Sequence, residues 1–98
     1  MYRIPAAGIA LDKAFTEHTW AEMSRLLNIN VAGTFFSVQL AVQQMLKQGT
    51  GGSVVLIASV ASHVAVPGQR LSAYHATKGA VRILGKTLSV ELAPKGIR

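Results

Sequence analysis

The run "VVLIASVA" at residues 54–61 constrains the fold of this chain more than any other feature of its sequence. It is apolar, rich in β-branched residues, and follows the glycine pair Gly51 and Gly52. Because polar residues do not alternate with the apolar ones, the run predicts a strand that is buried on both faces, as in the interior of a parallel sheet. A lone parallel strand leaves its backbone groups unpaired along both edges, so this strand needs neighbours.

Helical periodicity precedes this run. Over residues 17–47, apolar side chains recur mostly three or four positions apart. Thr16 or Thr19 can cap the start of this region, and Glu22 has the spacing of a capping-box partner for Thr19. The region exceeds the usual helix length of up to about 25 residues. It is therefore either one helix with a preamble or two helices that meet near Asn28.

A second helix is predicted over residues 72–92, where Pro94 and Gly96 end it. We expect residues 1–15 to form a strand end that runs into a loop, and residues 62–71 to form another loop. A helix, a buried strand and a helix in this order predict an α/β fold. The 98 residues are expected to be part of one doubly wound parallel-sheet domain of the Rossmann type.

Composition narrows the classes of partner. The formal net charge is +6, but the basic residues are scattered and aromatic residues do not interleave with them, so no nucleic-acid partner is predicted. No contiguous apolar run approaches the ~20 residues of a membrane span, and we predict no membrane association. Cysteine is absent, which excludes disulfides and favours the cytoplasm. His18, His63 and His75 share no metal-ligand spacing; we expect surface or loop positions for them and no metal site.

The segment "SAYHATKGAV" at residues 72–81 places Tyr74 and Lys78 four positions apart, on one face of the second helix. A free phenol has a pKa of about 10 and is a poor base near neutrality. A nearby ammonium group and a helix N-terminus both favour the phenolate, so a tyrosine in this setting can exchange a proton with an alcohol or carbonyl oxygen. The two-residue pattern is common by chance, so packing of Tyr74 with a solvated Lys78 is the alternative.

Ser59 adds a second polar group to this pair. It lies at the C-terminal end of the predicted strand, where ligands bind in open parallel sheets. A hydroxyl there can donate a hydrogen bond to the same substrate oxygen that Tyr74 protonates. The sequence therefore predicts a site formed by Ser59, Tyr74 and Lys78.

Five segments in this order resemble the short-chain dehydrogenase/reductase family: "AAGIALDKAF" (6–15), "NINVAG" (28–33), "GSVVLIASVAS" (52–62), "SAYHATKGAV" (72–81) and "LSVELAPKGIR" (88–98). The resemblance implies hydride transfer between NADP or NAD, with NADP preferred, and a small-molecule carbonyl or secondary alcohol. Tyr74 would then be the proton donor or acceptor, and Ser59 would orient the substrate oxygen.

The resemblance also implies roles for two further residues. Lys78 would hydrogen-bond the nicotinamide ribose and favour the tyrosine phenolate, so that Tyr74 and Lys78 both lie at the cofactor. Asn30 would help to hold a water in a proton relay that continues to Lys78. A polar residue that merely bends the helix near Gly33 is the alternative for Asn30.

Two departures from the family pattern stand out. Where the family has Asn-Asn-Ala-Gly, this chain has Pro5, Ala6, Ala7 and Gly8, so Ala7 and Gly8 are the cofactor contacts that the match implies, without the asparagines. Tyr74 follows Ser59 by fifteen residues, a longer spacing than the commonest one. This longer loop looks like the branch that reduces sugars and polyols, such as the sorbose, xylulose and mannitol or fructose reductases.

The glycine-rich phosphate loop of the family, Thr-Gly-x-x-x-Gly-x-Gly, has no match here, because "GTGGS" at residues 49–53 precedes a strand and no helix follows it. We therefore expect residues 1–98 to be the central to C-terminal portion of an NAD(P)-binding domain, and to bind a dinucleotide poorly alone. The alternative is a truncated, inactive chain that acts only in assembly. In the resembled family the two long helices pack against a second subunit, so a homo-oligomer is expected either way.

Overall fold

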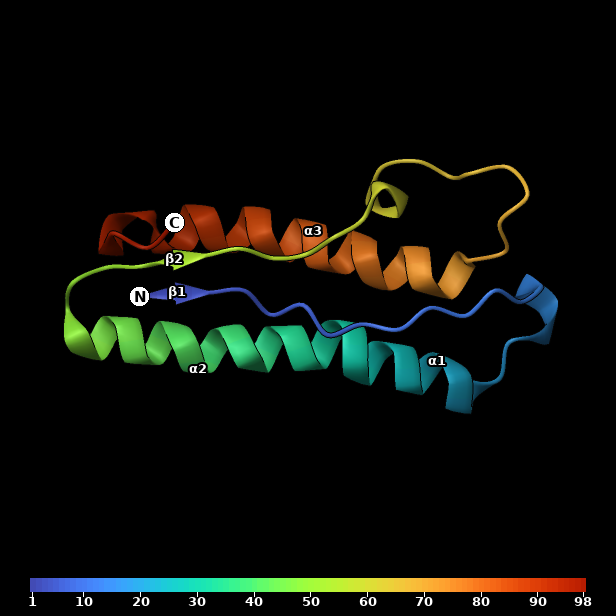
Figure 1. Ribbon diagram of the computed structural model, residues 1–98, viewed down its shortest axis with the longest axis horizontal. Helices are drawn as coiled ribbons and strands as arrows, with labels where there is room; N and C mark the ends of the chain where they lie inside the picture. Colours follow the sequence, from blue (N-terminus) through green and yellow to red (C-terminus); the bar gives the residue numbers. More distant parts are fainter.

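The computed structural model describes all residues, Met1–Arg98, and Figure 1 shows the order of its elements. The strands are β1 (Tyr2–Arg3) and β2 (Ser53–Val54), and the helices are α1 (Trp20–Leu26), α2 (Gly33–Gln48) and α3 (Ser72–Leu92). A π-helical segment, η2 (Leu27–Ala32), joins α1 to α2, and short 3-10 turns form η1 (Phe15–Glu17), η3 (Val60–Ser62) and η4 (Ala93–Lys95).

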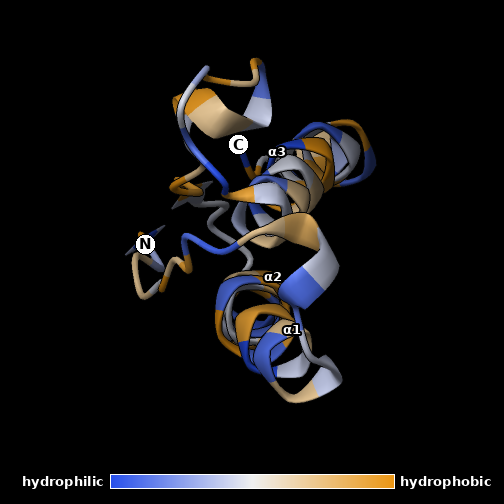
Figure 2. Ribbon diagram, turned by 90° about the vertical axis from the view of Figure 1, so that its right-hand side faces the viewer, coloured by the Kyte–Doolittle hydropathy of each residue, from blue (hydrophilic) through white to orange (hydrophobic).

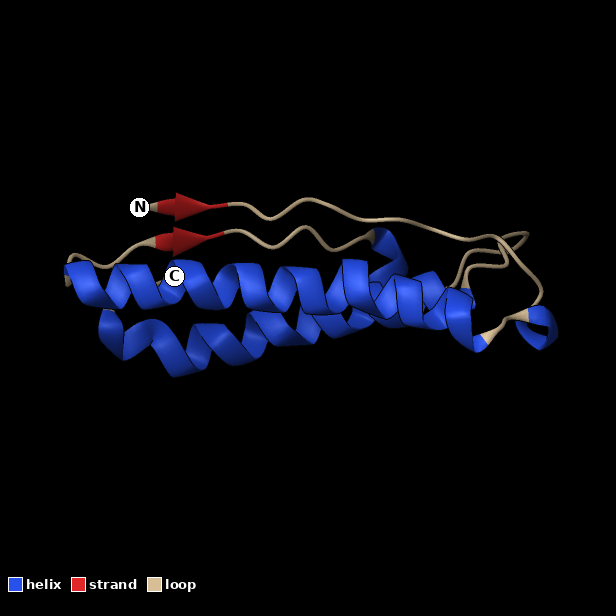
Figure 3. Cartoon of the chain, turned by 90° about the horizontal axis from the view of Figure 1, so that it is seen from below, coloured by secondary structure: helices blue, strands red, loops and turns tan.

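These elements form two layers. The extended segments around β1 and β2 lie on one side, and the helices lie side by side on the other (Figures 2 and 3). The radius of gyration is 15.1 Å and the extents are 48 × 25 × 17 Å. A compact domain of 100 residues has a radius of gyration of about 13 Å. The chain is thus an elongated slab with the α/β fold that the sequence predicts.

The sheet is parallel, as predicted. In β1 and β2, Tyr2 pairs with Ser53 and Arg3 pairs with Val54. On the opposite edge of β2, Gly52 and Ile97 form an isolated parallel bridge. The segment around β2 therefore has a neighbour on both edges, which is what an unpaired parallel strand requires.

The predicted strand over residues 54–61 is wrong in its extent and burial. Regular pairing ends at Val54, and the last bond of the ladder runs from the Val55 N–H to the carbonyl of Arg3. Val55 and Ile57 are 47% and 44% exposed. The physical reason is that the helices cover only one face of the extended layer (Figure 3), so the side chains of Val55 and Ile57 find no second layer.

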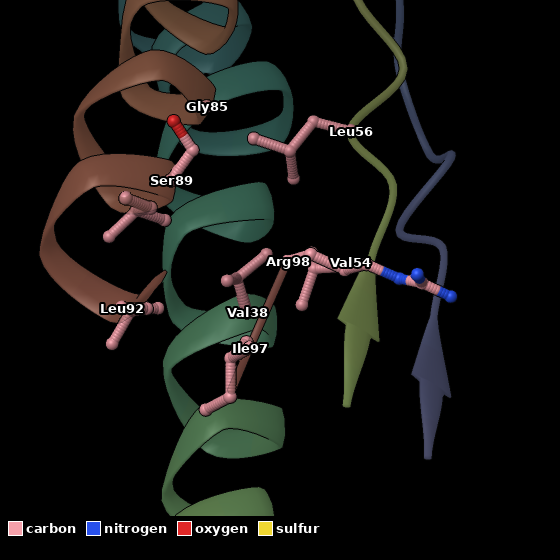
Figure 4. A pocket seen from close by; sticks show the side chains of 9 residues that line it. Val38, Val54, Leu56, Gly85, Ser89, Leu92, Ile97 and Arg98 are labelled. Carbon is pink, nitrogen blue, oxygen red and sulfur yellow. The ribbon is translucent and has the colours of Figure 1, made fainter. Parts of the chain in front are cut away.

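The interior lies between β2 and the two long helices. Val54 and Leu56 project from the extended segment towards α2 and α3 around a cavity of about 130 Å³ (Figure 4). A Cβ atom on Gly85 would lie 3.3 Å from Cδ1 of Leu56, so a glycine at this position lets α3 approach the extended segment closely. At the far end, Met45 is fully buried and packs with Ile97.

Both alternatives for the first helix are partly right. The residues from Trp20 to Gln48 form one continuous helix, and η1 is the preamble that precedes it. The irregularity expected near Asn28 is the π-helical segment η2. By length and composition this helix is apolar enough to cross a membrane, although it contains no long contiguous apolar run. A core helix has the same properties, and here Leu26, Val38 and Met45 are buried in the chain.

The start of α1 carries the predicted capping box. The Glu22 N–H donates to Oγ1 of Thr19 at 3.2 Å, and the Thr19 N–H donates to Oε1 of Glu22 at 2.9 Å. The Lys13 ammonium donates to the two carboxylate oxygens of Glu22 at 2.9 and 3.1 Å. The hydrogen bond from Lys13, followed by those from Thr19, lowers the pKa of Glu22 from 4.5 to about 2.

This shift predicts a pH dependence of stability. Because the pKa is lowered in the folded chain, the contribution of Glu22 is complete above about pH 4.5 and is lost as the pH falls through about 2. We expect the urea midpoint of Glu22→Gln to be lower than that of the unchanged chain at neutral pH and to converge with it near pH 2. Glu91→Gln, at an exposed carboxylate, is the control. Parallel pH profiles for Glu22→Gln and the unchanged chain would contradict this assignment.

Candidate active site

Asn30 joins three segments of the chain. It lies in η2 and is fully buried, at 0% exposure. Its Oδ1 accepts from the Ile9 N–H at 2.8 Å, and its Nδ2 donates to the Ile9 carbonyl at 2.8 Å and to Oγ1 of Thr77 at 3.0 Å. Asn30 therefore fixes the segment after β1 and the middle of α3 to the central helix.

Thr77 continues this network towards Tyr74. Its hydroxyl is fully buried and donates to the backbone carbonyl of Tyr74 at 2.8 Å, while it accepts from Asn30. π-helical turns inside α-helices occur frequently at functional sites. Here the π-helical segment η2 contains Asn30, whose side chain holds the first turns of α3 in place through Thr77.

Lys78 is a buried cation. Its side chain is 6% exposed, and Nζ donates to the carbonyl of Ile57 at 3.0 Å. The Lys78 backbone carbonyl accepts from Oγ of Ser62 at 2.8 Å. An ammonium group has three donors, so two N–H groups of Lys78 are free for another acceptor. The next two basic residues of α3 are less enclosed, because Arg82 is half-buried and Lys86 is exposed.

Tyr74 lies in the first turn of α3 and is half-buried. The Lys78 Nζ atom lies 5.9 Å from the centroid of its ring. The alternative in which Lys78 is solvated is therefore wrong, because the amine is inside the chain and near the phenol. The Tyr74 hydroxyl donates no hydrogen bond within the chain, which leaves it available to a ligand.

Ser59 lies where the extended segment ends and η3 begins. Its Oγ accepts from the Ala61 N–H at 3.2 Å, and its own hydroxyl proton has no acceptor within the chain. The Ser59 N–H donates to Oγ of Ser62 at 3.3 Å, so the two serines form a reciprocal cap around η3. No hydrogen bond joins Ser59 to Tyr74 directly.

The segment with Ala7 and Gly8 passes next to Lys78. Both residues are exposed, and a Cβ atom on Gly8 would lie 3.4 Å from Oδ1 of Asn30 and 3.5 Å from Nζ of Lys78. A side chain at position 8 would therefore fill space beside the amine. The bare backbone at Gly8 therefore leaves space beside the Lys78 amine for a ligand with hydrogen-bond acceptors.

Comparisons with known proteins identify relatives of the chain in both sequence and fold. Residues 4–98 match the family model described as short chain dehydrogenase. The NADP-dependent (R)-specific alcohol dehydrogenase of Lentilactobacillus kefiri is 39% identical over 91% of this chain and 34% of its own length. Carbonyl reductase 2 (NADPH) of Sus scrofa is 38% identical over 94% of this chain and 37% of its own length.

A crystal structure of a short-chain type dehydrogenase/reductase from Mycobacterium marinum superposes with a TM-score of 0.96 at 36% identity, over 99% of this chain and 38% of that one. The chain belongs to the short chain dehydrogenase family. It spans about a third of the length of these relatives. The resemblance stated from the five sequence segments is thereby confirmed.

Two residues of this candidate site escaped the sequence analysis. Thr77 was not among the predicted site residues, although it lies between Tyr74 and Lys78 in the sequence. Ser62, three residues after Ser59, has the spacing of a local cap but was assigned to a loop. The histidine prediction also needs correction, because His75 lies within α3 and is half-buried against the rest of the chain.

The network around Asn30 predicts the effect of a mutation. Thr77→Val keeps the shape of the side chain but leaves one Nδ2 hydrogen of the buried Asn30 without an acceptor, which costs about 1–3 kcal/mol. Thr87→Val removes a similar hydroxyl, which donates to the carbonyl of Ile83 on the exposed face of the same helix. We expect the control to change the unfolding free energy by less than about 0.5 kcal/mol. Equal losses in urea unfolding would contradict the role of Thr77.

Proposed function

We propose that this chain forms the catalytic part of an oxidoreductase that transfers a hydride between a nicotinamide cofactor and a carbonyl/secondary alcohol pair. The observation that carries the proposal is the buried amine of Lys78, which lies beside both Tyr74 and the backbone of Gly8. This arrangement puts one positive charge between a proton-transfer group and a surface suited to a cofactor.

Tyr74 transfers the proton in this mechanism. When the carbonyl is reduced, the Tyr74 hydroxyl donates its proton to the substrate oxygen, and in the reverse direction the phenolate accepts it. The positive charge of Lys78 stabilises the negative charge left on Tyr74. Ser59 donates its unused hydroxyl proton to the same substrate oxygen and so fixes its position.

NADP or NAD, when bound, supplies or accepts the hydride. Lys78 would hold the ribose through its free N–H groups, and Ala7 and Gly8 would provide the backbone against which the cofactor lies. NADP is the preferred form, because two relatives carry NADP or NADPH in their names. Pro5 and Ala6 stand where the family has asparagines, so this chain offers no amide side chain at those two positions.

Asn30 would help to hold a water in the proton relay that continues to Lys78. Both Nδ2 hydrogens are already donated, one to Ile9 and one to Thr77, and Oδ1 accepts from Ile9. The wide turn of η2 is the feature that would let a water reach this part of the helix. The bending role and the relay role of Asn30 are thus compatible.

The substrate class is a small alcohol, carbonyl compound or sugar. Relatives are named as an alcohol dehydrogenase, a carbonyl reductase and an L-rhamnose-1-dehydrogenase. The long loop between Ser59 and Tyr74 favours a sugar or polyol. We further propose that residues 1–98 are the central to C-terminal portion of an NAD(P)-binding domain, and that the protein acts in the cytoplasm.

The catalytic assignment can be tested in a chimera. The 98 residues replace the matching third of carbonyl reductase 2 from Sus scrofa, which then supplies the rest of the domain. We expect Tyr74→Phe to reduce NADPH oxidation by at least about 100-fold, the usual contribution of a general acid. Binding of NADPH, measured by fluorescence, should change little. Tyr2→Phe, at an exposed tyrosine of β1, is the control; retained turnover in Tyr74→Phe would overturn the assignment.

A second candidate function is assembly without catalysis. The outward faces of the long helices expose large apolar side chains, among them Phe35, Phe36 and Leu40 on α2 and Ile83 and Val90 on α3. A groove with a volume of about 310 Å³ runs between the two helices. A second copy of the chain is the occupant that the family resemblance favours, and a homo-oligomer is compatible with catalysis as well.

Assembly is tested by one charge on this surface. We expect the chain to sediment as a dimer and Phe35→Glu, within the groove, to sediment as a monomer, because a buried unpaired carboxylate is costly. Ile4→Glu puts the same charge on the extended layer, where Ile4 is exposed, and should leave the dimer intact. A monomer in all three samples, or dissociation by Ile4→Glu alone, would contradict assembly through α2 and α3.

A further inference from the structure

The loop of residues 63–69 lies between Ser59 and Tyr74 in the sequence, so it connects the parts of the chain that carry these two site residues. After η3 it arches away from the helices and comes back to the start of α3 (Figure 1). Its first anchor is Ser62, whose Oγ donates to the carbonyl of Lys78 at 2.8 Å. This bond fixes the beginning of the loop to the helix that carries Tyr74 and Lys78.

The second anchor lies at Arg70 and is here named the Asp12–Arg70 clip. The Arg70 Nε donates to Oδ1 of Asp12 at 3.0 Å, and the Arg70 N–H points at Oδ2 of Asp12 at 3.5 Å. The Lys13 N–H donates to the Arg70 carbonyl at 2.9 Å. Three contacts thus join two segments that lie 58 residues apart in the sequence.

Between its anchors the loop has no other long-range hydrogen bond. The Val64 N–H donates to the carbonyl of Val60, and the Gln69 N–H donates to the carbonyl of Val66, and both bonds are local. Except for Val66, which is half-buried, residues 63–69 are exposed. The position of the loop therefore depends on Ser62 at one end and on the clip at the other.

The clip also bears on Tyr74. No side chain caps the start of α3, where Ser72 is the first helical residue and Tyr74 the third. The clip ends two residues before this uncapped start. On its other side, Lys13 pairs with Glu22 of the capped start of α1. The clip therefore ties the uncapped first turn of α3, which holds Tyr74, to the capped first turn of α1.

We propose that Asp12 and Arg70 are positioning residues that hold the loop of residues 63–69 as one wall of the substrate site beside Tyr74. The apolar residues of this loop, Val64, Val66 and Pro67, would contact the carbon skeleton of a carbonyl substrate. The inference rests on the proposed function, since a substrate wall requires a substrate at Tyr74. It adds to that function the part of the chain that selects the substrate.

The clip itself is tested without any turnover. Amide hydrogen exchange over residues 63–70 of the 98-residue chain should be roughly two- to fivefold faster in Asp12→Asn and in Arg70→Gln, the change that loss of an exposed ion pair allows. The double variant Asp12→Arg with Arg70→Asp restores the pair with reversed charges and should return the exchange to its original rate. Glu17→Gln removes a nearby exposed carboxylate and is the control. Unchanged exchange in both single variants would overturn the proposal.

The substrate wall is tested in the chimera described above. Asp12→Asn should raise KM for the carbonyl substrate severalfold, with a smaller change in kcat and none in KM for NADPH. A purely structural role would instead lower the amount of active enzyme and leave the KM values unchanged, and that result would overturn the wall. A chimera without turnover, combined with faster exchange in Asp12→Asn, would contradict the proposed function and the wall with it. Unchanged exchange with an active chimera would overturn the clip and the wall that depends on it, and would leave the proposed function intact.

Discussion

The hydrogen bond between the Lys78 ammonium and the Ile57 carbonyl is the interaction on which the site depends. A buried charge needs hydrogen-bonded partners, and a partly buried carbonyl outside a ladder is stabilised by a donor. Regular pairing of the sheet ends at Val54, so the carbonyl of Ile57 has no strand neighbour to bond with it. The Lys78 ammonium donates to the Ile57 carbonyl, and this hydrogen bond holds the amine near Tyr74.

The early end of strand pairing is therefore linked to the position of Lys78 in the site. If the extended segment continued as a fully paired strand, the Ile57 carbonyl would be taken and Lys78 would need another acceptor. Because the ladder stops, the segment from residue 55 to residue 59 bonds instead to a side chain of α3, and Ser59 ends it at the same site. The Tyr74 phenol, the Ser59 hydroxyl proton and two N–H groups of Lys78 have no partner within the chain, and the proposed mechanism uses these groups.

Sequence reasoning was most successful where the physics is local. Periodicity located the long helices, the Thr19 capping box was predicted from two residues three positions apart, and the four-residue spacing placed Tyr74 beside Lys78. Sequence reasoning failed where burial depends on a second layer, because Val55 and Ile57 look like core residues by composition alone. It also missed the role of Thr77 and the Asp12–Arg70 pair, since nothing in local spacing indicates contacts between residues 47 or 58 positions apart.

The network around Asn30 holds the segment in which the chain departs from the family pattern. The asparagines expected at positions 5 and 6 are replaced by Pro5 and Ala6, which carry no amide to secure this segment. Asn30 instead bonds both the N–H and the carbonyl of Ile9, directly after Gly8. The backbone beside Lys78 is thus held from the helix, through a buried side chain whose geometry does not depend on residues 5 and 6. A substitution at those two positions can therefore alter what a ligand contacts there without releasing Gly8 from the site.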